Sequence, residues 1–171
     1  EDLNENLYII TGPAGVGKST ISKKIAISKE KSVLIEGDDI YLQVIGGYVP
    51  AWKQGNHLDI FWKICIGTID TYLKNGYDVI FNYIIPPISF NVLKEKFKNY
   101  NIKFVVLLVD EKTIIERDNC RPTDCQMHER CITLLNNFKK YDFGNDYFLA
   151  TINLSIDKTI EIIETREKFN V

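Results

Sequence analysis

Short runs of apolar residues alternate with longer amphipathic segments along this chain. The runs at 7–11, 32–36, 77–85 and 103–109 are mostly apolar, without a strict alternation of apolar and polar residues, and are rich in β-branched residues. Such runs predict strands that are covered on both faces of a sheet. A fifth, shorter strand is expected near 147–151.

The strongest helical pattern runs from His57 to Asn75. Its apolar residues recur every three or four positions, as they do on one face of a helix. Asn75 and Gly76 end the pattern in the way a left-handed helix C-cap does. Further helices are expected after the first strand and at 89–100, 111–119, 127–141 and 156–168.

Strands that alternate with helices build a parallel sheet with helices on both faces, which is an α/β architecture. The 171 residues are enough for one domain, and no linker, repeat or low-complexity tract divides them. A folded chain of this mass buries about 70% of its surface, so the core needs no metal or disulfide. We therefore predict a single domain over residues 1–171.

The composition limits the classes of binding partner and the cell compartment that fit this chain. The chain has 21 basic and 23 acidic residues, a net charge of −2, so it lacks the basic excess typical of proteins that bind nucleic acid. The longest clean apolar run, 104–109, is far too short to span a bilayer, and no export leader is present. Four cysteines are too few for a disulfide scaffold, which favours the cytoplasm. Cys120, Cys125 and Cys131 lack the paired spacing of structural zinc ligands.

A phosphate-binding pattern, G-x-x-x-x-G-K-[ST], lies where the first strand turns into the first helix. It consists of Gly12, Pro13, Ala14, Gly15, Val16, Gly17, Lys18 and Ser19, followed by Thr20. The glycines let backbone N–H groups turn inward around an anion, and the helix adds its positive N-terminal dipole. Lys18 can reach the β- and γ-phosphates of ATP, and the Ser19 hydroxyl can ligate Mg²⁺. The alternative, a glycine-rich turn with no ligand, is disfavoured by the position of the pattern between strand and helix.

Two carboxylates, Asp38 and Asp39, follow the second strand. The carboxyl ends of parallel strands are where open α/β sheets bind ligands. One carboxylate can accept a proton from an attacking hydroxyl, and the other can hold the substrate or a water bound to the metal. The alternative is that these residues cap a helix that starts near Ile40.

Arginines gather between residues 117 and 130. Arg117 lies on a predicted helix, and Arg121 precedes a proline that breaks the helix into a loop. A mobile lid with arginines can close over a triphosphate, stabilise the transferring group and exclude water. The alternative is a solvated turn in which these arginines pair with neighbouring acidic residues.

The segment 41–56 is glycine-containing and aromatic, with Tyr41, Tyr48 and Trp52. Such rings stack on sugar or base faces, so these three residues can form a wall of a substrate pocket. They can equally cover the core, and the sequence does not decide between the two.

Four segments carry a resemblance to a known family: ITGPAGVGKST, IEGDDIY, GGYVPAW and the R-D-x-x-R of Arg117 to Arg121. Together they resemble the small P-loop kinases. The nearest type is the gluconate-kinase-like group, which is similar to shikimate kinase and chloramphenicol phosphotransferase. The resemblance covers residues 7 to about 163.

The resemblance implies a three-layer fold in which five parallel strands follow the order 2-3-1-4-5, with an ATP site and a small lid over about 117–130. It implies that Asp38 contacts the acceptor and acts as the base. It further implies that the loop at 151–154, which contains Asn153, cups adenine. Relatives often carry an acidic residue where this chain has Asn82, whose amide can position a hydroxyl but cannot take a proton.

These observations favour an ATP- and Mg²⁺-dependent kinase that acts on a small hydroxyl compound, with gluconate suggested by analogy. The roles expected are phosphate binding by Lys18 and the glycine loop, Mg²⁺ binding by Ser19 and Asp38, and a clamp by Arg117 and Arg121. One alternative is a nucleotide-binding regulator without transfer activity, and another is a kinase for a nucleotide or antibiotic. Either a monomer or a homodimer is compatible with the sequence.

Overall fold

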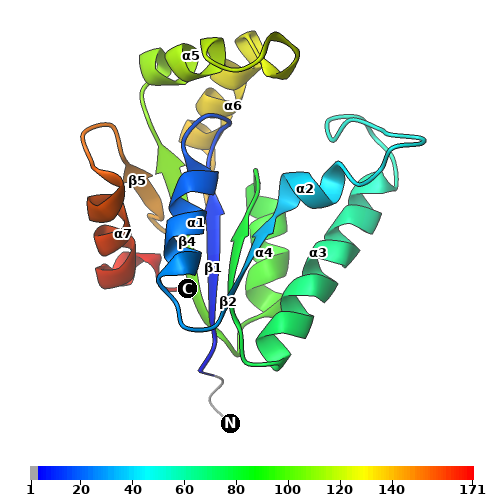
Figure 1. Ribbon diagram of the computed structural model, residues 1–171. Coiled ribbons are helices and arrows are strands. Elements are labelled where there is room, and N and C mark those ends of the chain that lie inside the picture. The colour runs from blue at the N-terminus through cyan, green and yellow to red at the C-terminus, as the bar shows by residue number, and fades with distance from the viewer. Residues whose placement is uncertain (1–3) are drawn as a thin grey trace.

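A five-stranded parallel sheet forms the centre of the protein, and helices cover both of its faces (Figure 1). The structure, a computed structural model, describes residues 4–171. The strand order is β2-β3-β1-β4-β5, which confirms the predicted fold class and sheet order. The strands are β1 (Asn6–Thr11), β2 (Ser32–Glu36), β3 (Asp78–Asn82), β4 (Asn101–Leu108) and β5 (Phe148–Ala150).

Within residues 4–171, seven α-helices connect and flank the strands. They are α1 (Lys18–Ile27), α2 (Gly37–Tyr41), α3 (His57–Lys74), α4 (Pro87–Lys96), α5 (Glu111–Asn119), α6 (Glu129–Lys140) and α7 (Ile156–Thr165). Short 3₁₀ turns lie at Thr123–Cys125 and Glu167–Phe169. Most boundaries agree with the expected ones to within a few residues. The exceptions are α2, which the sequence offered only as an alternative with a later start near Ile40, and the end of β3.

Strand β3 is shorter than the apolar run 77–85 predicts. It ends at Asn82, because its neighbour β2 ends opposite, at Glu36, and offers no further partner. Beyond that point the Ile85 N–H donates instead to the Thr11 hydroxyl, at 2.8 Å. Pro87 then occupies the first turn of α4, where the missing N–H costs no hydrogen bond.

Alternate residues of the strands face two separate apolar cores. On one face, Ile9 and Phe81 pack with the buried side chains of α3 and α4. On the other face, Ile10 and Val105 pack with those of α1 and α7. This two-sided burial explains why the strands are mostly apolar rather than alternating.

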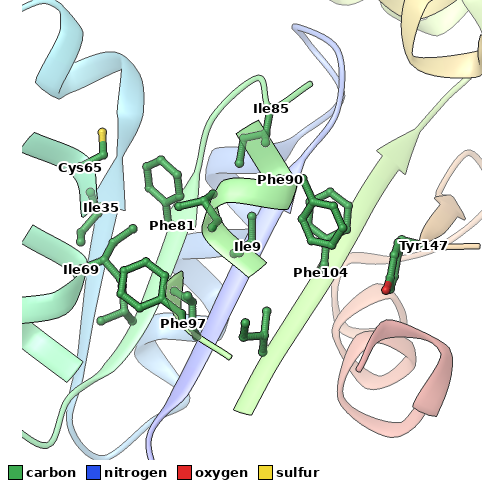
Figure 2. Close-up of a cluster of buried hydrophobic side chains, with 14 of the residues drawn as sticks. Ile9, Ile35, Cys65, Ile69, Phe81, Ile85, Phe90, Phe97, Phe104 and Tyr147 are labelled. Carbon is green, nitrogen blue, oxygen red and sulfur yellow. The ribbon is translucent and has the colours of Figure 1, made fainter. Parts of the chain in front are cut away.

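The first of these cores is rich in aromatic rings (Figure 2). Phe90 of α4 stacks on Phe104 of β4, with ring centroids 3.9 Å apart and an interplanar angle of 17°. Tyr147 meets both rings edge-on. Cys65 of α3 is buried in the same core near Ile35, so it serves as a small apolar side chain there (Figure 2).

The carboxyl ends of β1, β2, β3 and β4 lie at one edge of the sheet, because the strands are parallel. The start of α1, helix α2 and helix α5 all emerge there. Figure 1 shows α5 and the start of α6 above this edge on one side and the loop after α2 on the other. Within residues 4–171, no helix combines the length and apolarity that crossing a bilayer requires.

Candidate active site

The glycine loop between β1 and α1 has the backbone geometry of an anion cradle. Gly15 and Gly17 have φ angles of 81° and 103°, in the left-handed region that favours glycine. Gly17 caps α1 without a side-chain hydrogen bond, and the first turn of α1 contains no acidic residue. The N–H groups at this helix end therefore stay available to a negatively charged ligand.

Gly12 has a different task, which is close packing against the sheet. A Cβ atom there would lie 2.4 Å from the main-chain oxygen of Leu107 in β4. Any side chain would push the loop off the end of the strand. Gly12 and Pro13 therefore support the cradle from below rather than line the cleft.

Basic side chains converge on this loop from two elements. The Lys18 ammonium donates to the main-chain oxygens of Gly12 and Pro13, at 3.0 Å each. From α5, Arg117 donates to the oxygen of Gly15 at 3.0 Å. The guanidinium of Arg121 lies 3.8 Å from where a Cβ of Gly15 would be. The fold therefore gathers three positive charges, those of residues 18, 117 and 121, at one loop.

Lys18 titrates differently from an ordinary lysine. Burial at the base of the loop lowers its pKa to about 8, because removing water disfavours the ammonium. The positive charge of Arg121 lowers the pKa as well, whereas the carboxylates of Asp38 and Glu36 raise it. A bound phosphate would supply the negative charge that this arrangement lacks.

The sequence predicts Ser19 and Asp38 as Mg²⁺ ligands, and the structure brings a second carboxylate, that of Glu36, to Ser19. The Ser19 hydroxyl donates to the Glu36 carboxylate, at 3.3 Å. A hydroxyl and carboxylates are hard oxygen donors, the kind that Mg²⁺ prefers. Among residues 4–171 no three His, Cys, Asp or Glu side chains gather as a metal site, so a cation here needs phosphate oxygens as further ligands.

Glu36 is a site residue that the sequence reasoning missed. The sequence pattern places Glu36 at the end of a predicted strand, and the predicted carboxylates of the site are the two aspartates that follow it. The available signal was an acidic residue at the last position of a parallel strand, where side chains reach the ligand edge.

The two aspartates after β2 do not share one environment. Both lie in the first turn of α2, whose N-cap is Glu36, and neither caps the helix, so the capping interpretation is wrong. Asp38 is exposed and lines the cleft, whereas Asp39 does not line it. Successive residues on a helix point about 100° apart, which separates the two carboxylates.

Tyr83 is a second residue that the sequence reasoning passed over. Its ring packs on Gly37, where a Cβ would lie 2.6–2.8 Å from three of the tyrosine's atoms. The close approach fixes the start of α2, and with it the backbone that carries Asp38. Tyr83 also lines the cleft and rests on Phe61, with ring centroids 4.7 Å apart.

The segment after α2 forms an aromatic wall of the cleft. Tyr41, Tyr48 and Trp52 all line it, as the sequence reasoning allowed. The Tyr41 hydroxyl donates to the main-chain oxygen of Val49 and so ties the loop to α2. Asn82 lines the cleft from the end of β3 and is itself only 5% exposed.

Residues 117–130 fold over the same cleft and are organised around Asp118. This buried carboxylate accepts hydrogen bonds from the N–H groups of Met127 and His128, which lowers the pKa of Asp118. Arg121 lies 3.8 Å from it. Arg121 therefore lines the cleft and also lies near an acidic neighbour, and its role in a lid stays a prediction.

One contact joins the lid to the aromatic wall. The guanidinium carbon of Arg130, at the start of α6, lies 3.6 Å from the centroid of the Trp52 ring. Arg130 and Trp52 are 78 positions apart in the sequence, and both line the cleft.

The loop after β5, residues 151–154, lines the cleft with the residues at its two ends. The Leu154 N–H donates to the Thr151 oxygen, and this turn leaves residues 152 and 153 exposed. Thr151 and Leu154 line the cleft, and Asn153 does not. The contact predicted between this loop and adenine stays a prediction, and the lining residues of the loop are 151 and 154 rather than Asn153.

The whole cleft has a volume of about 900 Å³, at the upper end of the range for small-molecule sites. No family model matches the chain. A chain of the Pnkp1/Rnl/Hen1 RNA repair complex is 21% identical, with a TM-score of 0.64 over 82% of this chain and 47% of that one. This chain thus spans about half the length of that match.

Two other similar structures match along most of both chains. A sugar kinase from Janibacter sp. is 15% identical, with a TM-score of 0.69 over 92% of this chain and 91% of that one. A gluconokinase from Sinorhizobium meliloti is 17% identical, with a TM-score of 0.63 over 95% and 90%. The chain has the fold of the P-loop kinases. At these identities the likeness shows the fold alone.

Proposed function

We propose that this protein transfers the γ-phosphoryl group of ATP to a hydroxyl group of a small molecule. The observation that carries the proposal is the meeting of Lys18, Arg117 and Arg121 at the glycine loop, in the same cleft that Asp38 lines. Three cations suit a triphosphate, and the nearby carboxylate suits an acceptor hydroxyl.

Each group has a distinct part in this proposal. The backbone N–H groups from Ala14 to Thr20 and the Lys18 ammonium bind the β- and γ-phosphates, while Gly12 and Pro13 support the loop. Arg117 and Arg121 stabilise the charge on the group in transfer and hold the lid over it. Asp38 accepts the proton that the acceptor hydroxyl loses as its oxygen bonds to phosphorus.

The donor set also fits Mg²⁺, which would be held by Ser19 together with Glu36 and Asp38. When bound, Mg²⁺ supplies positive charge to the phosphate oxygens. The 3.3 Å contact between the Ser19 hydroxyl and Glu36 supports this assignment, because it brings two suitable oxygens together beside the loop.

The main rival is a regulator that binds nucleotide without phosphoryl transfer. The sequence has no [NT]-K-x-D pattern of the kind that reads guanine in switch GTPases. The acceptor side of the cleft, lined by Asp38 and the aromatic wall, also favours an enzyme, because a switch needs no pocket for a second substrate.

The test measures ADP release with Mg·ATP over a panel of sugar acids, neutral polyols, nucleosides and hydroxylated antibiotics. Gluconate, which the family resemblance suggests, is one member of the panel. The expected result is turnover that rises with one class of acceptor and falls at least 100-fold in Lys18→Ala and in Asp38→Asn.

Asp39→Asn is the matched control, since it removes a neighbouring carboxylate that does not line the cleft. It should keep most of the activity. Tight ATP binding with no turnover on any acceptor, or equal losses in Asp38→Asn and Asp39→Asn, would contradict the proposal.

A further inference from the structure

The half of the cleft that faces the acceptor has its own chemistry, and this chemistry indicates an acceptor class. The inference rests on the proposed function, because it concerns the second substrate of that reaction. The lining residues on this side share either an aromatic ring or a short polar group. They are Asp38, Tyr41, Tyr48, Trp52, Asn82 and Tyr83.

Positive charge in the cleft is concentrated at the phosphate loop. The Lys18 and Arg117 side chains both donate to oxygens of that loop. The Arg121 guanidinium lies beside Gly15. These three positive charges therefore lie in the half of the cleft that is formed by the phosphate loop, away from the acceptor half.

The acceptor half is left with little to bind an anion. Arg130, the other arginine that lines the cleft, lies over the Trp52 ring at 3.6 Å. Two carboxylates, those of Asp38 and Asp124, line the cleft and would repel a carboxylate on the acceptor. An uncharged acceptor therefore fits this half better than a sugar acid does.

The aromatic wall keeps exposed ring surface, although Arg130 covers one face of the Trp52 ring. Trp52 is 64% exposed and Tyr48 is 44% exposed, although both line the cleft. Tyr41 and Tyr48 meet edge-on, with centroids 5.8 Å apart. Exposed ring faces at the mouth of a cleft favour a planar ligand, because stacking removes both apolar surfaces from water.

Asn82 adds a hydrogen-bonding requirement. Its side chain is almost fully buried, and its amide nitrogen has no hydrogen-bond partner among the described residues. A buried polar group without a partner costs free energy, so a ligand that pairs with it gains affinity. The amide can turn to offer oxygen in place of nitrogen, and the edge of a nucleobase carries both donors and acceptors.

The geometry points to a neutral alcohol built on a planar, unsaturated ring with hydrogen-bonding groups at its edge, as in a nucleoside. The ring stacks on the wall formed by Tyr48 and Trp52, and Asn82 pairs with its edge. The acceptor hydroxyl oxygen forms the bond to the γ-phosphorus, and its proton passes to Asp38. The bond between that phosphorus and the bridging oxygen breaks, and ADP leaves.

The activity test compares uridine, cytidine, adenosine and guanosine with D-gluconate and sorbitol. The kcat/KM for at least one nucleoside should exceed that for gluconate and for sorbitol at least tenfold. Trp52→Ala should raise the KM for this nucleoside about tenfold through lost stacking. Asn82→Asp, which keeps the shape and adds a negative charge, should lower kcat/KM by a similar factor. Tyr72→Ala, which removes an exposed ring paired with Tyr77 outside the cleft, should change neither.

A binding test gives a readout that needs no turnover. The chain has two tryptophans, so Trp62→Phe leaves Trp52 as the fluorescent reporter. Saturable quenching by a nucleoside is expected in this variant and in the parent protein, and gluconate and sorbitol should cause none.

The outcomes separate the two claims. Turnover of gluconate or sorbitol without turnover of nucleosides overturns this inference and leaves the kinase function standing. Quenching by nucleosides with no ADP release on any acceptor overturns the kinase function and keeps the ligand class. Nucleosides that neither quench Trp52 nor support turnover overturn the inference.

Discussion

The lowered pKa of Lys18 leads to a quantitative prediction about nucleotide binding. With a pKa of about 8, about nine-tenths of the free protein carries a charged Lys18 at pH 7 and about a tenth does at pH 9. A bound phosphate stabilises the ammonium, so the charged form is the one that binds. Affinity is therefore full below pH 8 and falls as the pH rises. The loss between pH 7 and pH 9 should be about tenfold, or about 1.4 kcal/mol.

The assay is calorimetric titration with ADP at pH 8.5 to 9 in two buffers of different ionisation enthalpy. The difference in heat should show uptake of between a half and one proton per ADP bound. The phosphates of ADP lose their last proton near pH 6, so they add nothing in this range. Lys18→Met is the control and should abolish the uptake. Equal heats in both buffers with the parent protein, and an affinity unchanged from pH 7 to pH 9, would refute the assigned environment of Lys18.

Three further predictions concern the lid, the start of α2 and the core. Asp118→Asn removes the charge that holds the N–H groups of residues 127 and 128. Limited proteolysis between 118 and 128 should become faster at an unchanged melting temperature, and equal cleavage rates would contradict this. Gly37→Ala should displace the Tyr83 ring and lower kcat/KM about tenfold, whereas Gly67→Ala, with nothing within 4 Å of its Cβ, should not. Phe104→Ala breaks the stack with Phe90 and should cost about 3–5 kcal/mol in the free energy of unfolding, measured by urea denaturation. A loss below 1 kcal/mol would mean that the ring is not part of a close-packed core.

The Asp118 carboxylate also predicts how the lid responds to acid. Hydrogen bonds from the N–H of Met127 favour its charged form and lower its pKa. The charged carboxylate therefore stabilises the lid fully at any pH above the usual aspartate pKa, near 4. This stabilisation is lost as the pH falls through the lowered pKa of Asp118. The proteolysis rate of the lid in the parent protein should stay constant from pH 7 down to about pH 4.

The elements of the fold could be predicted well from the sequence, because they depend on local patterns. The run 103–109 is mostly apolar since both faces of β4 are covered, and the pattern from His57 to Asn75 matches α3 to within one residue. The end of β3 could not be predicted, because it depends on where β2 stops. Helix α2 was expected only as an alternative, with a start near Ile40, because five residues are too few for a periodic signal.

For the site, the sequence by itself determined the phosphate loop, since its glycines, Lys18 and Ser19 are adjacent and their chemistry needs only that spacing. The sequence also predicted that Asp38, Arg117 and Arg121 act in the same phosphoryl-transfer site. What only the tertiary structure decided is which side chains share the cleft. The difference between Asp38 and Asp39 is a rotation about a helix axis, and the contact of Gly37 with Tyr83 joins two residues 46 positions apart in the sequence. Distances of this kind are set by packing between distant segments, which no local pattern encodes.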